Sequence, residues 1–331
     1  MIRLALLLAA SAMMAGAALV GTALAQPAPR DPAWPLRPIR LIAPFPPAST
    51  VDVIARILGQ KLSARLGQQL VIDNRAGASG NIGADAIAKA APDGYTLGVV
   101  TVSTQAIAVT LSPNLPYDPV KDFTPIALVA SSPYALVVYA GLPAKSVADL
   151  IGLAKSKPGV LNYGSAGPAS LAHLAGALFA TSTDISLTHV PYKSSAQSVV
   201  DLISGRLDMQ FATIAPTLAN IRAGQLRALA VTGKNRVEAL PDVPTMDAAG
   251  VPGYEAVLWF ALVGPAGLPA SIAARLNREV IEVLNSPEMK ATLEQQGFVG
   301  DGGTPQALTD QVRRDIAKWR EVIPKAGIKG E

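Results

Sequence analysis

The stretch IRLIAPFPPASTVD, residues 39–52, places the end of a strand and the start of a helix within one short segment. Its first five residues form a nearly continuous apolar run, typical of a strand buried on both faces of a parallel sheet. Three prolines then stop the strand, and apolar residues from Val51 to Leu66 follow a helical period. The small residues Ala48, Ser49 and Thr50 therefore stand at a helix N-terminus, in a loop that the prolines hold in a fixed shape.

A second stretch, LNYGSAGPAS at residues 161–170, repeats this pattern of strand, small residues, hydroxyls and helix. Helix N-termini carry unpaired N–H groups and a partial positive charge, and they bind anions. Such loops lie at the carboxyl ends of parallel strands, where ligands bind. The pair predicts a cleft for a small molecule with a carboxylate. Either loop alone is explained by an ordinary N-cap, Ser49 or Thr50 on one helix and Ser170 on the other.

Strand and helix patterns alternate along the chain and predict an α/β protein with parallel sheets covered on both faces. Two chain crossings divide it into two α/β lobes, the first of them built from both ends of the chain. Strands are predicted at residues 39–43, 70–72, 95–102, 126–130, 135–140, 161–163, 187–190, 208–212, 226–231 and 259–263. Helices are predicted at residues 51–66, 82–91, 147–157, 171–179, 196–204, 216–223, 270–285, 287–296 and 305–326. The predicted organisation is a signal peptide at 1–25, a tether at 26–36, lobe 1 at 37–129 and 254–331, and lobe 2 at 130–253.

The N-terminus has the three parts of a secretory signal peptide. Arg3 supplies a charge, residues 4–22 are apolar or small, and Ala23-Leu24-Ala25 is a cleavage site. A membrane anchor is the alternative, because the apolar run is long enough to be borderline. The chain has no cysteine, so it has neither disulfides nor the lipid attachment of a lipoprotein. We therefore expect a periplasmic protein, cleaved after Ala25, whose stability comes from its core.

The composition excludes most kinds of catalytic and metal site. Without cysteine and with two histidines, thiol nucleophiles are impossible and the usual zinc ligands are missing. The spacing of GASGNIG, residues 77–83, does not match the dinucleotide-binding pattern, and GSAG at 164–167 fails the nucleophile-elbow pattern. We expect no cofactor, no metal and no nucleic-acid partner, since the net charge of +4 falls only to +3 without Arg3 and shows no basic tract. A serine hydrolase using Ser165 or Ser170 with His173 stays an alternative beside a structural role for the histidine.

Long stretches of this chain resemble the Bug (Bordetella uptake gene) family, the extracytoplasmic solute receptors of tripartite tricarboxylate transporters. The resemblance covers nearly all of the mature chain and includes RPIRLIAPFPP, VIDNRAGASGNIGADAIAKAAPDGYTLG, LNYGSAGPASLAHLAGALF and LPDVPTMDAAGVPGYE. It implies a type II periplasmic-binding-protein fold, in which two α/β lobes joined by a two-strand hinge close on a ligand. It also implies no enzymatic activity, a small organic carboxylate as ligand, and a monomer that delivers it to membrane permease subunits. A periplasmic sensor without a transport role is the alternative, with a sensor domain as partner.

The resemblance also implies ligand contacts, largely from backbone N–H groups and ordered waters. The matching positions lie in the two loops, after the third strand and at two further strand ends. They are Phe45, Pro47, Ala48, Ser49, Val51, Asp52, Ser103, Thr104, Gln105, Ser165, Ala166, Gly167, Ser170, His173, Tyr192, Lys193, Ala212 and Thr213.

Several of these positions depart from the family pattern. Glycines are usual where this chain has Ala48 and Ser49, and an aspartate is usual at Ala212. Further departures are Val51, Ser194 and Ala108-Val109. The added Cβ atoms limit backbone approach, and the missing carboxylate removes an acceptor for an amino group. We therefore expect a pocket that prefers a carboxylate without an ammonium group.

Overall fold

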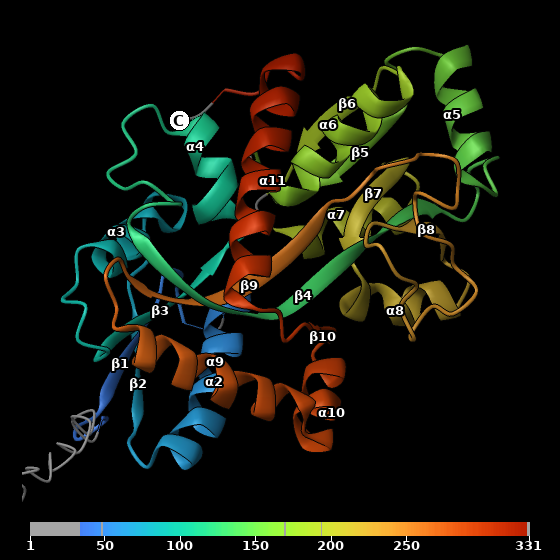
Figure 1. Ribbon diagram of the computed structural model, residues 1–331. Helices are drawn as coiled ribbons and strands as arrows, with labels where there is room; N and C mark the ends of the chain where they lie inside the picture. The colour runs from blue at the N-terminus through green and yellow to red at the C-terminus, as the bar shows by residue number, and fades with distance from the viewer. Residues whose placement is uncertain (1–33, 48, 169, 193, 330–331) are drawn as a thin grey trace, which may run out of the picture. The chain divides into compact units, whose positions relative to one another are not determined.

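The computed structural model describes residues 34–47, 49–168, 170–192 and 194–329 (Figure 1). The predicted signal peptide, and the tether up to residue 33, lie outside these residues. The chain divides into two units, residues 1–34 and residues 35–331, and the fold described below belongs to the second. Within the described residues, no helix combines the length and the apolar character needed to cross a membrane.

The first sheet begins with three parallel strands, as the sequence predicted. β1 (Ile39–Ala43) lies between β2 (Leu70–Asn74) and β3 (Thr96–Thr101). Helices α2 (Thr50–Leu66) and α3 (Asn81–Ala88) provide the crossovers. Four of the five β1 residues are buried, in agreement with its apolar run. Helix α2 starts at its N-cap Ser49 and ends where Gly67 adopts a left-handed conformation.

Two antiparallel strands complete the first sheet and connect it with the second. β9 (Val257–Pro265) pairs with β3 on one side and with β4 (Phe123–Tyr139) on the other. The prediction of two strands interrupted at Ser131-Ser132-Pro133 is wrong, because β4 is one continuous strand of 17 residues. Pro133 ends the ladder with β9, and Tyr134 begins the ladder with β7. The N–H that proline lacks therefore falls where the strand changes partners, so it interrupts no ladder.

The second sheet uses the C-terminal half of β4. β4 pairs antiparallel with β7 (Met209–Thr213) and β8 (Leu226–Val231), while β5 (Asn162–Ser165) pairs parallel with β6 (Thr188–Pro191) and β7. Its helices are α5 (Val147–Ser156), α6 (Leu171–Thr183), α7 (Ser195–Ile203) and α8 (Ile214–Arg222). These elements match the predicted order. The boundaries of the two predicted lobes stay predictions.

The C-terminal segment returns to the first sheet. It contains α9 (Ala270–Asn285), α10 (Pro287–Gln295), the short strand β10 (Val299–Gly300) on β4, and α11 (Pro305–Lys325). Helices α9 and α2 lie side by side below the first sheet in Figure 1. Helix α11 contacts β4 and also α6, so it packs against elements of both sheets. It is fixed to β9 because the buried Trp259 Nε1–H donates to Asp315 Oδ2 at 2.7 Å.

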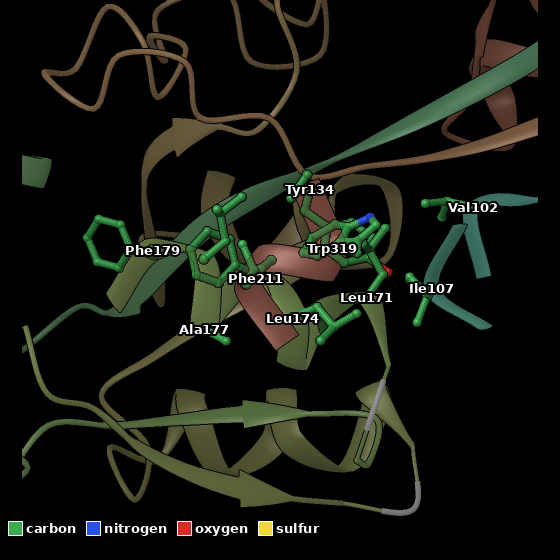
Figure 2. Packing of buried hydrophobic residues seen from close by; sticks show 14 of the residues in the cluster. Val102, Ile107, Tyr134, Leu171, Leu174, Ala177, Phe179, Phe211 and Trp319 are labelled. Carbon is green, nitrogen blue, oxygen red and sulfur yellow. The ribbon is translucent and has the colours of Figure 1, made fainter. Parts of the chain in front are cut away.

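One apolar cluster runs from the first sheet into the second. Figure 2 shows Trp319 of α11 beside Tyr134 of β4 and Leu171 of α6, with Val102 and Ile107 nearby. The Trp319 side chain is fully buried. The core therefore includes the region where the chain passes between the sheets.

Both chain crossings are joined through one buried hydroxyl. Thr232, directly after β8, accepts a hydrogen bond from Tyr134 N–H at its Oγ1 (2.8 Å) and donates from the same Oγ1 to the Ala256 carbonyl (2.7 Å). Its backbone N–H donates to the Tyr134 carbonyl (2.9 Å), and its carbonyl accepts from Ala256 N–H (3.2 Å). Tyr134 lies on β4 and Ala256 precedes β9, so Thr232 ties the outgoing and returning chain together.

Replacing Thr232 by valine keeps the shape of the side chain and removes the hydroxyl. Because a buried donor and a buried acceptor lose their partner, we expect the free energy of unfolding to fall by about 1–3 kcal/mol, measured by urea denaturation. Thr232→Ser, which keeps the hydroxyl, is the control and should retain more of the stability. Equal loss in the two variants would contradict this role of the hydroxyl.

Candidate functional site

A cavity of about 650 Å³ opens at the carboxyl ends of β1 and β3 and at the N-terminus of α6. Its wall includes the short helical segments η1 (Ala78–Gly80), η2 (Ser103–Ile107) and α4 (Ala108–Leu111). The lining residues are Phe45, Ser49, Thr50, Val51, Ala78, Ser79, Asn81, Thr101, Ser103, Ile107, Ala108, Leu111, Ser112, Tyr134, Pro168, Ser170, Leu171, Leu258, Phe260 and Lys329. The starts of α2, α3 and α6 therefore share one cavity.

The loop after β1 is fixed by a buried carboxylate behind it. Ser49 Oγ caps α2 by accepting from the Asp52 N–H at 3.3 Å. Asp52 is 3% exposed; its Oδ1 accepts from Asn74 Nδ2 at 2.9 Å and its Oδ2 from Arg56 Nε at 2.9 Å. Asn74 Nδ2 also donates to the Phe45 carbonyl at 3.0 Å. Asp52 thus positions the loop and does not line the cavity itself.

The glycines of GASGNIG let the loop after β1 approach α3 closely. A Cβ at Gly80 would come within 2.9 Å of the Phe45 ring, and one at Gly83 within 2.6 Å of the Pro44 Cα. Ala78 and Ser79 adopt positive φ of 46° and 55°, and both line the cavity. The glycines of this stretch, whose spacing does not match the dinucleotide-binding pattern, therefore serve packing beside the cavity. Its contribution to the wall was not predicted from the sequence.

The loop after β5 is closed by two serines and a glycine. Ser170 Oγ donates to the Gly167 carbonyl at 2.8 Å and accepts from the His173 N–H at 3.3 Å, which caps α6. Ser165 Oγ donates to the Gly167 carbonyl at 3.0 Å and accepts from the Gly167 N–H at 3.1 Å. Gly167 has φ of 110°, a conformation that favours glycine. The loop shape is thus set by its own hydrogen bonds.

The serine–histidine pair differs from the one considered from the sequence. Ser165 Oγ is hydrogen-bonded to His189 Nε2 at 2.7 Å, whereas His173 stacks on His189 with ring centroids 3.7 Å apart. Ser165 is fully buried, so its hydroxyl is closed to a substrate. The pair therefore holds β5 to β6 below the loop.

Burial lowers the pKa of both histidines. Burial and, to a smaller extent, the neighbouring His189 ring together lower the pKa of His173 to about 4, because two positive charges would repel across the stack. Burial also lowers the pKa of His189. Both rings are consequently neutral at pH 7, which permits the close stack.

Five of the predicted binding residues line the cavity together: Phe45, Ser49, Val51, Ser103 and Ser170. Tyr192 instead donates from its hydroxyl to Asp201 Oδ2 at 2.8 Å, and Ala212 is buried in the second sheet at 1% exposure. Ala48 and Lys193 lie outside the described residues. The remaining predicted residues are not part of the cavity wall, namely Pro47, Asp52, Thr104, Gln105, Ser165, Ala166, Gly167, His173 and Thr213. Ligand contact by any of the eighteen stays a prediction.

The polar chemistry of the wall comes from hydroxyls, amides and one cation. Asn81 Nδ2 donates to Ser112 Oγ at 3.1 Å, and the Tyr117 hydroxyl donates to Asn81 Oδ1 at 2.9 Å, which fixes the start of α3 against the end of α4. Among the described lining residues, Lys329 has the only charged side chain. The part of the chain that the structure describes has no cluster of histidine, aspartate and glutamate suited to a metal ion. The cavity is therefore suited to an anion.

Comparison with known proteins agrees with this chemistry. The model of the tripartite tricarboxylate transporter family receptor, TctC, matches residues 54–328. Among solved structures, Rpa4515 of R. palustris with adipate is 40% identical, with a TM-score of 0.75, over 90% of this chain and 100% of that one. MatC (Rpa3494) from Rhodopseudomonas palustris with bound malate is 31% identical, with a TM-score of 0.71, over 88% and 100%. The periplasmic binding protein BugD is 29% identical, with a TM-score of 0.71, over 90% and 100%.

The histidine stack predicts a stability that depends on pH. A pKa lowered from 6.5 to about 4 means that the unfolded chain binds the proton first, so stability is complete above pH 6.5 and decreases as the pH falls toward 4. Allowing for the partial exposure of the ring, we expect a loss of about 1 kcal/mol between pH 7 and pH 5, measured by thermal unfolding.

The matched control for this loss is His173→Phe, which keeps an aromatic ring on His189 and cannot titrate. Its unfolding midpoint should change less between pH 7 and pH 5 than that of the wild type. Identical pH profiles would rule out the histidine stack as the source.

Proposed function

Because this chain belongs to the tripartite tricarboxylate transporter receptor family, a family of solute-binding receptors and not of enzymes, we propose that it captures a small organic carboxylate in the cavity between α2, α3 and α6. The observation that carries the proposal is the meeting of helix starts and hydroxyls in a cavity whose described lining residues include no aspartate and no glutamate. The first N–H groups of a helix have no partner within it, and they bind a carboxylate well when the dipole adds to the attraction.

The two capped loops support carboxylate binding in a fixed geometry. The hydroxyl of Ser49, the N-cap of α2, and that of Ser170, the N-cap of α6, each accept from the third N–H of the helix, which leaves the earlier N–H groups for a ligand. Both loops are held from behind, one by Asp52 and Asn74 and the other by Ser165. Little ordering is then needed on binding, which favours affinity.

We propose that capture proceeds by closure of the two lobes. A carboxylate held between α2 on the first sheet and α6 on the second contacts both lobes only when they approach. Binding then shifts an open–closed equilibrium by the difference in affinity for the two states. The crossings at Tyr134 and Ala256, joined through Thr232, are where the backbone would bend.

The cellular setting is proposed from the same relationship. The signal-peptide pattern and the periplasmic relative BugD support a periplasmic location after cleavage behind Ala25. The receptor would act as a monomer and deliver its ligand to the permease subunits of a tripartite transporter. The relatives with adipate and malate support a dicarboxylate, and a wall without described acidic residues supports a ligand that lacks an ammonium group.

We expect a selective thermal shift with carboxylates. The mature chain from Gln26 would be unfolded with adipate, malate, succinate, citrate, glutamate and benzoate. At a hundredfold excess over the dissociation constant, a ligand that binds only the folded state adds about 2.7 kcal/mol. Dicarboxylates without an ammonium group should raise the unfolding midpoint more than glutamate, which has one. No shift with any of these acids would refute carboxylate capture, and tight glutamate binding would refute the discrimination against ammonium.

A further inference from the structure

The chain after α11 is turned back toward the cavity by a defined cap. Gly327 adopts a left-handed φ of 64°, its N–H donates to the Pro324 carbonyl (3.0 Å), and the Ile328 N–H donates to the Ile323 carbonyl (3.1 Å). This pair of bonds is the Schellman motif. Ile328 packs against the main apolar cluster. The residues after the helix are therefore held by hydrogen bonds and burial and do not simply fray.

This cap brings Lys329 to the wall of the cavity. In Figure 1 the chain leaves the end of α11 and runs toward α4, and Ala108 and Leu111 of α4 line the cavity together with Lys329. Lys329 has no hydrogen bond or ion pair with the described residues, unlike Lys325, which pairs with Glu321 at 2.7 Å, and Lys318, which pairs with Asp315 at 2.7 Å. Its ammonium group is thus available to an anion in the cavity.

The position of this charge relative to the helix starts has a consequence for the ligand. The described lining residues include the N-termini of α2 and α6 and one cation carried by a separate segment, with no acidic side chain between them. A ligand with one carboxylate can bind either a helix N-terminus or the ammonium group of Lys329, but not both. A ligand with carboxylates at both ends can satisfy both, and a cavity of about 650 Å³ has room for it.

We propose that Lys329 binds the second carboxylate of a dicarboxylate ligand and thereby selects dicarboxylates over monocarboxylates. This inference rests on the proposed function, because it places the first carboxylate at the helix starts. Lys329 lies just beyond the residues 54–328 matched by the family model. An exposed ion pair contributes little, and a hydrogen bond to a charged group in a closing cleft contributes more. We therefore expect a three- to tenfold effect on affinity.

The test compares acids that differ only in the second carboxylate. Dissociation constants of the mature protein would be measured by calorimetry for succinate and butyrate, glutarate and pentanoate, and adipate and hexanoate. The wild type should bind the dicarboxylate of at least one pair more tightly. Lys329→Met should weaken that dicarboxylate three- to tenfold and change its monocarboxylate less than twofold. Lys325→Met removes the same charge from the end of α11 outside the cavity wall and should change neither.

A positional variant separates the charge from its placement. Gly327→Val keeps Lys329 but strains the left-handed cap, so it should weaken the dicarboxylate and spare the monocarboxylate. Equal affinities of Lys329→Met and wild type, or equal weakening of both acids of a pair, would overturn the role of Lys329 while leaving carboxylate capture standing. If the wild type binds none of the six acids, the role of Lys329 in selecting dicarboxylates is overturned, while the thermal-shift panel above tests the proposed function separately.

Discussion

The four hydrogen bonds around Thr232 are the constraint on which the rest of the molecule depends. They hold β4, the end of β8 and the start of β9 together at the place where the chain passes between its sheets. Strand β4 stays continuous through this place, because it exchanges its ladder partner β9 for β7 at Pro133 and Tyr134. Helix α11 then covers the passage with the fully buried Trp319. In the closure proposed above, the chain would bend at this place while the sheets on either side keep their own hydrogen bonds.

The cavity gains its chemistry from helix ends and not from charged side chains on the sheets. Its loops are shaped by contacts on the side away from the ligand space: Asn74 on the Phe45 carbonyl, Ser165 on Gly167, and the glycines of GASGNIG against Pro44 and Phe45. Ser165 and His189, which resemble catalytic groups, thus hold β5 and β6 together. This division explains how the loops before α2 and α6 can hold a defined shape while the first N–H groups of the helices are left to the proposed ligand.

Local patterns predicted most of the fold, because the apolar period of a strand or helix needs only neighbouring residues. Strand β1 and helix α9 lie at their predicted bounds. Proline chemistry misled the prediction at β4, since the sequence does not reveal that the missing N–H of Pro133 falls between two ladder partners. The two loops of the candidate site were recognised from their residues. The pairing of Ser165 with His189, and the arrival of Lys329 at the cavity, depend on segments that are distant in sequence, and no local signal marks them.

The position of β9 between β3 and β4 also determines the order in which the chain can fold. Strand β3 ends at Thr101, but its antiparallel neighbour begins only at Val257, after the whole second sheet has been synthesised. Until then β3 and the first half of β4 have exposed edges that can pair with other chains. Closing this long loop is slow compared with the local pairing of β5 and β6. The second sheet can therefore form while the first is still open, and β9, in the last quarter of the chain, is needed before either edge is protected.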